Sequence, residues 1–84
     1  MKFIVEFDND FHGEFMTATM SFDVPNKEVL ENMLAKATQN FLANKTDSFV
    51  VDGYKPLRLG QHDPDMSYRI MTLDEFFNQH NHTI

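Results

Sequence analysis

The residues best suited to electrostatic chemistry are the acids of a nine-residue stretch, 6–14. This stretch contains four acids and no Lys or Arg, so its charge is −4. A cluster of this sign attracts cations and basic protein surfaces. Phe11 and His12 lie between the acids and add one apolar and one titratable side chain. The candidate partner-binding residues are Glu6, Asp8, Asp10, Phe11, His12 and Glu14.

Part of this stretch has the spacing of a calcium loop, in which acids at alternate positions precede a glycine. Counting from Asp8, the sixth residue is indeed Gly13. The fifth residue, however, is His12, a poor ligand for a hard cation, and the twelfth is Thr19 rather than a bidentate glutamate. We therefore predict no metal site here and interpret the acids as turn-forming residues at the end of a hairpin.

Histidine near carboxylates suggests acid–base chemistry, and His62 with Asp63 is such a pair. Pro64 and Asp65 follow at once, so the segment is more typical of an exposed turn. The three serines lie in no Gly-rich elbow, and the three glycines are isolated, which excludes a phosphate-cradling loop. We expect a protein that is not an enzyme and that needs no cofactor.

A zinc site is suggested only by His80 and His82, which supply two ligands where three or four are needed. The chain has no cysteine, so thiolate ligands, disulfides and cysteine nucleophiles are excluded. We predict no resident metal.

The composition is that of a globular chain, with 42% apolar and 24% charged residues and nine Phe. With 84 residues, a single domain spanning 1–84 is expected. The net charge of −6 disfavours direct nucleic-acid binding. No stretch has the length or apolarity of a signal sequence or a membrane span, so we expect a cytoplasmic protein.

Residues 2–8 and 16–24 alternate apolar and polar side chains with the period of half-buried strands. Residues 8–13 join them, and Asn9, Asp10 and Gly13 favour a loop of hairpin size. The expected inward-facing residues are Phe3, Val5, Phe7, Met16, Ala18, Met20, Phe22 and Val24.

A helix is predicted over residues 27–43. Asn26 has the character of an N-cap, Glu28 places an acid in the first turn, and Asn44 is a plausible left-handed C-cap. One apolar stripe indicates that this helix covers a face of a sheet. The stripe comprises Val29, Leu30, Met33, Leu34, Ala37, Phe41 and Leu42.

Three shorter strands are expected after the helix, at 48–51, 54–59 and 68–71. The turn signal Asp52-Gly53 joins the first two, and Pro56 assigns the second to a sheet edge.

The chain then predicts a short C-terminal helix, because residues 72–75 have the pattern of a capping box. The polar tail 78–84 is expected to fray. The predicted fold is α+β, with an antiparallel sheet of four or five strands, a long helix on one face and a short terminal helix, in the order β-β-α-β-(β)-β-α.

The favoured functional hypothesis is a small acidic binding protein that presents the hairpin to a partner protein with a basic surface. If the acids are spaced like phosphates, the protein is an inhibitor that mimics nucleic acid and occludes a nucleic-acid-binding site. Phe11 is then either the apolar anchor of that interface or a side chain folded back over the sheet edge. The alternative is a self-associating, dimeric accessory domain that pairs through the edge near Pro56 or through the outer sheet face. A small enzyme is the third and least favoured hypothesis.

Overall fold

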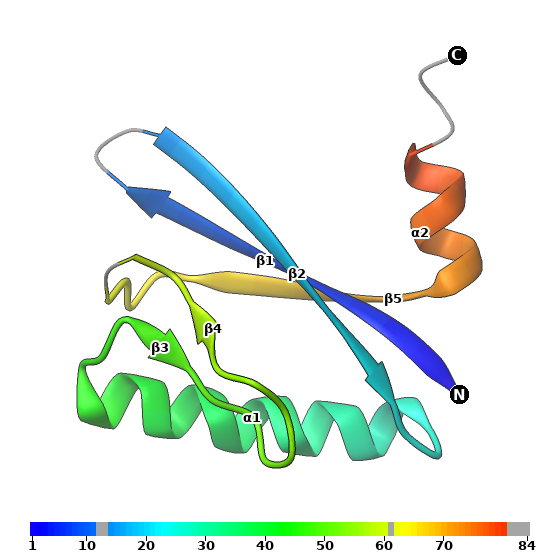
Figure 1. Ribbon diagram of the computed structural model, residues 1–84, viewed down its shortest axis with the longest axis horizontal. Helices are drawn as coiled ribbons and strands as arrows, with labels where there is room; N and C mark the ends of the chain where they lie inside the picture. The colour runs from blue at the N-terminus through cyan, green and yellow to red at the C-terminus, as the bar shows by residue number, and fades with distance from the viewer. Residues whose placement is uncertain (12–13, 61, 81–84) are drawn as a thin grey trace.

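The computed structural model describes residues 1–11, 14–60 and 62–80; for residues 9–11, 14–16 and 80 it describes the backbone alone. Figure 1 shows a twisted sheet above a long helix, with a short helix at the C-terminal end. The elements in chain order are β1 (Lys2–Phe11), β2 (Glu14–Asp23), α1 (Lys27–Asn44), β3 (Ser48–Phe49), β4 (Leu57–Arg58), β5 (Ser67–Thr72) and α2 (Leu73–His80). The predicted α+β class, with two helices and an antiparallel sheet, is confirmed.

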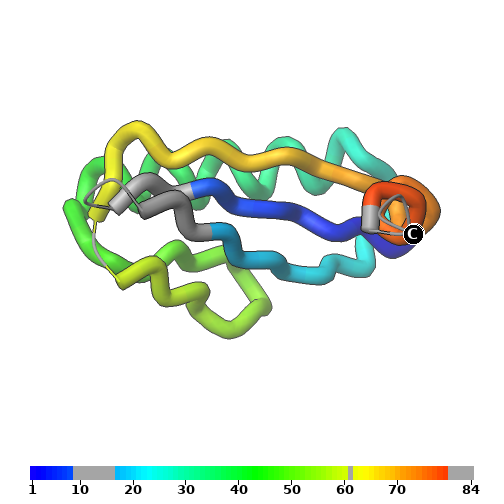
Figure 2. Tube along the Cα trace, turned by 90° about the horizontal axis from the view of Figure 1, so that it is seen from above, coloured from blue at the N-terminus to red at the C-terminus, as the bar shows by residue number. Residues whose placement is uncertain are grey.

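The main sheet has three strands in the order β2-β1-β5, and both neighbours run antiparallel to β1. The prediction of four or five strands in one sheet was wrong, because β3 and β4 pair only with each other. Each contributes two residues to that separate ladder, with Ser48 opposite Arg58. Figure 2 shows this second pair beyond β2, on the side away from β5.

The turn signal between β3 and β4 is correct locally but does not close a tight hairpin. Gly53 has a φ of 83°, and the Tyr54 N–H donates to the Val51 carbonyl oxygen at 3.0 Å. This turn lies within a wider connection, residues 50–56, so Pro56 belongs to a loop and not to an edge strand.

The start of α1 follows the sequence prediction and its end differs by one residue. The Asn26 Oδ1 atom accepts a hydrogen bond from the Val29 N–H at 2.9 Å, which confirms the N-cap. The left-handed residue at the other end is Lys45, with φ 49° and ψ 43°, and not Asn44. The Lys45 N–H donates to the Phe41 carbonyl oxygen, which ends the helix with a single closing bond.

The core lies between the inner face of the sheet and α1. Phe3, Val5 and Phe7 of β1 are at most 2% exposed, as their alternation predicts. From α1, the buried residues are Leu30, Leu34, Ala37 and Phe41. Val29 and Leu42 were predicted in this stripe but are exposed, since each lies about 100° around the helix from its buried neighbour.

The short helix α2 packs against the outer face of the sheet, near the start of β1 and the end of β5. Met71 of β5 is buried on that outer face, directly opposite Ile4 in the β1–β5 register. The capping box is confirmed, because the Thr72 N–H donates to Glu75 Oε1 and the Glu75 N–H donates to Thr72 Oγ1, each at 3.1 Å. The helix extends to His80, and residues 81–84 lie outside the described part, so the fraying expected for the tail 78–84 stays a prediction.

Candidate functional site

The acidic stretch lies on the two strands of the β1–β2 hairpin. β1 continues to Phe11, which pairs with Glu14, the first residue of β2. The prediction of a loop over 8–13 was therefore wrong for residues 8–11. The turn-forming preference of Asn9 and Asp10 is outweighed by ladder pairing with Met16 and Phe15, residue types that favour strands.

The register places the predicted partner-binding residues along one hairpin arm and at its end. Residues 6, 8 and 10 occupy every second position of β1, and Phe11 and Glu14 face each other where the two strands meet the connection. His12 lies outside the described residues, and so do the side-chain environments of Asp10, Phe11 and Glu14.

Glu6 is held by an intramolecular ion pair. Arg69 lies directly opposite it on β5, and the Arg69 Nη2 atom is 3.1 Å from Glu6 Oε1. The same nitrogen donates to Gln79 Oε1 on α2 at 3.0 Å. Because the Glu6 side chain is only 14% exposed and its charge is compensated by Arg69, it chiefly ties β1 to β5 and α2.

Asp8 is the carboxylate of this arm with an unmet hydrogen-bond acceptor. Asp8 as a whole is half-buried. Its Oδ1 atom, however, is buried and has no hydrogen-bond partner among the described residues. Thr17 and Ser67 are its neighbours across the two ladders. A buried acceptor without a donor is unfavourable by about 1–3 kcal/mol.

The outer face of the sheet beside β2 is polar and open. Thr17, Thr19, Ser21 and Asp23 are all exposed, and α2 contacts β1 and β5 instead. A shallow hollow of about 410 Å³ begins at Ser21 and Asp23 and reaches Tyr54 on one side and Leu73 on the other. The open face adjoins the acidic hairpin arm, whereas the hollow, which Lys2 also lines, lies at the end of the hairpin opposite to the Phe11–Glu14 pair.

The predicted histidine–carboxylate pair forms a structural turn. The ring of His62 lies 4.7 Å from that of Phe41, and its Nδ1 atom is 3.1 Å from the Thr46 carbonyl oxygen. Asp63 Oδ1 accepts the Asp65 N–H at 2.9 Å, which is the bonding of an Asp-initiated turn. These contacts fasten the loop before β5 to the C-terminal end of α1.

Across residues 1–11, 14–60 and 62–80, no group of three or more His, Asp or Glu side chains is placed to hold a metal ion. The side chain of His80 and the whole of His82 lie outside the described residues, so the weak zinc signal of this pair is not tested. In the same residues, neither helix has a segment of the length and apolarity needed to traverse a bilayer.

Comparisons with protein-family models, with curated proteins and with solved structures found no match for this chain.

Two features of the site were not predicted from the sequence. The contact of Glu6 with Arg69 joins residues 63 positions apart and depends on the β1–β5 register, which no local pattern specifies. The position of β2 at an edge of the sheet depends on strand order, which alternation of side chains does not encode.

Proposed function

We propose that this protein is a small acidic, non-enzymatic binding protein that presents the β1–β2 hairpin to a basic surface of a partner protein. The observation that carries the proposal is charge: residues 3–26 contain five acids and no Lys or Arg. This segment includes all of β2 and most of β1, so the five acids belong to one hairpin. The unmet acceptor on Asp8 adds a specific position at which a partner's Lys or Arg is favoured.

The spacing of the acids supports an inhibitor of nucleic-acid binding. Residues 6, 8 and 10 recur every second position along β1, a rise of about 6.8 Å per acid. One strand of DNA carries one phosphate per about 3.4 Å along the helix axis. Asp8 and Asp10 therefore offer roughly one negative charge for every second phosphate, which supports the proposal, whereas the charge of Glu6 is compensated by Arg69.

The test is an affinity capture from the cell that produces the protein, at low and at moderate salt, followed by association kinetics with the captured partner. The variant D8N/D10N/E14Q removes three charges from the hairpin without large changes in shape. We expect it to bind more slowly and with a weaker dependence on salt.

A matched control removes three charges elsewhere. Glu31, Asp52 and Asp65 are exposed and lie outside the hairpin. The variant E31Q/D52N/D65N has the same net charge as the hairpin variant, so it separates local from global charge. Equal binding by the wild type and the hairpin variant would contradict the proposal, as would equal losses in the two variants.

A second candidate is a self-associating accessory domain. The observation that favours it is the open outer face beside β2, where Thr17, Thr19 and Ser21 are exposed. Sedimentation velocity at micromolar concentration tests it, and a monomer would rule it out. For either function the compartment we propose is the cytoplasm, which fractionation of the source cell checks.

A further inference from the structure

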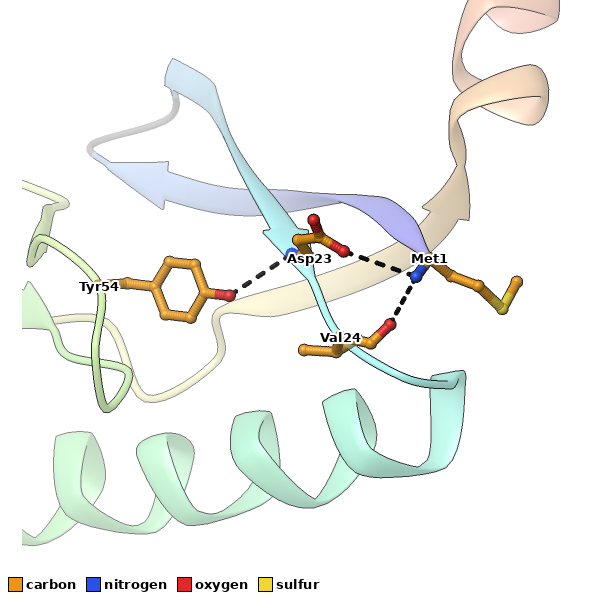
Figure 3. Close-up of polar contacts among 4 residues, drawn as sticks. All are labelled: Met1, Asp23, Val24 and Tyr54. Carbon is orange, nitrogen blue, oxygen red and sulfur yellow. Dashed lines mark hydrogen bonds and ion pairs between the residues drawn. The ribbon is translucent and has the colours of Figure 1, made fainter.

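The hydrogen-bond pattern of the hairpin identifies which backbone groups of β2 point away from β1. The Met1 amino group donates to the Val24 carbonyl oxygen at 2.8 Å (Figure 3), and the Val24 N–H donates to the Met1 carbonyl oxygen at 3.0 Å. In an antiparallel ladder such pairs alternate with pairs that exchange none. Counting back from Val24, the even-numbered residues of β2 therefore bond to β1, and the N–H and C=O groups of Thr17, Thr19 and Ser21 point outward.

The same alternation is visible at the end of the strand. The Asp23 N–H points away from β1 and donates to the Tyr54 hydroxyl oxygen at 3.4 Å (Figure 3). The Tyr54 ring lies 4.6 Å from that of Phe22. The 50–56 loop thus caps one end of the outward edge, while Thr17, Thr19 and Ser21 have no backbone partner on that edge within the described residues.

This edge lacks the features by which proteins usually block strand addition, namely Lys, Pro and bulges. β2 contains no Lys and no Pro, and its register with β1 is unbroken over ten residues. The other edge of the sheet differs, because β5 has six residues, carries Arg69, and has its Thr72 N–H occupied by Glu75. β2 is the edge open to an added strand.

Two observations oppose a second copy of this chain as the occupant. Two hairpins with five acids and one lysine each would face one another along the junction. In addition, the β3–β4 pair extends beyond β2 on the α1 side of the sheet (Figures 1 and 2). Two copies joined along β2 would bring both β3–β4 pairs beneath the same junction, whereas an added strand from another protein would meet only one.

We propose that β2 binds an extended, basic segment of a partner protein, which adds to the sheet as a fourth strand by hydrogen bonding to Thr17, Thr19 and Ser21. This inference rests on the proposed function and specifies how the hairpin recognises its partner. Main-chain bonds would supply affinity, and alternate side chains would supply specificity. A partner residue that pairs with Thr17 would lie two strand spacings, or about 10 Å, from Asp8. If that residue is Lys or Arg, its long side chain would cross the short Thr17 side chain on the outer face and extend toward Asp8.

The probe is a nine-residue peptide that alternates Lys and Val, acetylated and amidated, with the same peptide N-methylated throughout as a charge-matched control. Amide hydrogen exchange of the wild type is measured by NMR with and without peptide. At ten times the Kd, exchange at Thr17, Thr19 and Ser21 is expected to slow about tenfold. Exchange at Ala18 and Met20, which bond to β1, is expected to stay as slow as in the free protein.

The proposal is overturned if the peptide does not bind at millimolar concentration, if the three amides are unchanged, or if the N-methylated peptide binds equally well. A free protein that sediments as a dimer with these amides already protected would also overturn it, because a second copy would then occupy the edge.

Two substitutions at one position provide an independent test. T19P removes the outward N–H without removing a bond to β1, whereas T19V keeps that N–H and the preference for a strand. We expect T19P to weaken peptide binding about tenfold or more and T19V to change it less than about twofold. Equal affinities for the two variants would overturn the proposal.

The charge variant D8N/D10N/E14Q separates this inference from the proposed function. If it loses binding while T19P retains it, the acidic surface is functional and strand addition is wrong. If neither variant loses binding, both proposals fail.

Discussion

Arg69 of β5 and Glu6 of β1 are directly opposite in the sheet register, and the guanidinium of Arg69 also reaches Gln79 of α2. One side chain therefore joins the central strand, an edge strand and the terminal helix. The Arg69 side chain is 55% exposed, so water screens its charge, but the Glu6 side chain beneath it is mostly buried. The pair thus differs from an ordinary surface ion pair.

We expect R69A to lower the free energy of unfolding by about 1 kcal/mol, because it leaves the carboxylate of Glu6 without its cation. The control is R58A, since Arg58 lies 3.6 Å from Asp47 and its side chain is 82% exposed. That pair should be worth less than about 0.5 kcal/mol. Urea denaturation measures the stability of both variants. Equal midpoint shifts for R69A and R58A would show that the Glu6–Arg69 contact stabilises the protein no more than an exposed ion pair does.

Phe49 is the aromatic side chain that links the small β3–β4 ladder to the main core. It is fully buried, and its ring lies 5.0 Å from Phe7 and 5.8 Å from Phe41. F49A should cost about 3–5 kcal/mol. A chain of this length has a total stability of about 4–12 kcal/mol. The variant is expected to be largely unfolded if the wild type lies at the bottom of that range, where the loss equals the whole stability, and to remain folded but weakened otherwise.

The matched control for that prediction is F77A, because Phe77 on α2 is 56% exposed. Its effect should stay within about 0.5 kcal/mol. Thermal melts followed by circular dichroism compare the two variants. A similar loss from F77A would mean that α2 is buried against something in solution.

The sequence predicted those elements whose local signals agreed with their tertiary surroundings. The alternation from Phe3 to Phe7, the Asn26 N-cap and the capping box that begins at Thr72 all depend on neighbours within a few residues, and all three are confirmed. Each places a side chain by a periodicity or a hydrogen bond that the chain supplies locally.

The errors arose where a distant segment decided the outcome. Asn9 and Asp10 are turn formers, but pairing with β2 extends the strand through them. Asp52 and Gly53 do form a turn, yet the described β3–β4 ladder covers only two residue pairs, and Tyr54 in the loop around the turn packs against Phe22. The acids of the candidate site were identified from composition, whereas the open edge of β2 required the strand order.

Lys45 offers a stabilising substitution. It adopts the left-handed conformation that ends α1, with φ 49°, where a side chain is disfavoured by roughly 1–2 kcal/mol relative to glycine. Glycine also gains freedom in the unfolded chain, which offsets part of this difference. We expect K45G to raise the free energy of unfolding by about 0.5–1 kcal/mol, measured in urea. K45A is the control, since it removes the charge and keeps the strain, and an equal gain from K45A would assign the effect to charge.

The capping box of α2 makes the free energy of unfolding fall as the pH becomes acidic. The N–H of Thr72, and secondarily its hydroxyl, hold the pKa of Glu75 below its ordinary value of 4.5. A carboxyl whose pKa is lower in the folded state contributes stability above pH 4.5, and this contribution is lost as the pH falls through the folded-state pKa. Urea midpoints measured at neutral pH and at a pH of about 3 should therefore differ more for the wild type than for E75Q, whose side chain does not titrate.

The variant T72V identifies which group of Thr72 causes that pH dependence. It removes the hydroxyl that accepts the Glu75 N–H and keeps the backbone N–H that donates to Glu75 Oε1. Because the backbone bond is the larger cause, T72V should lower stability at neutral pH yet retain most of the difference between the two pH values. If T72V instead abolishes the difference, the hydroxyl and not the backbone sets the pKa of Glu75, and the N-terminal turn of α2 is held chiefly by its side-chain cap.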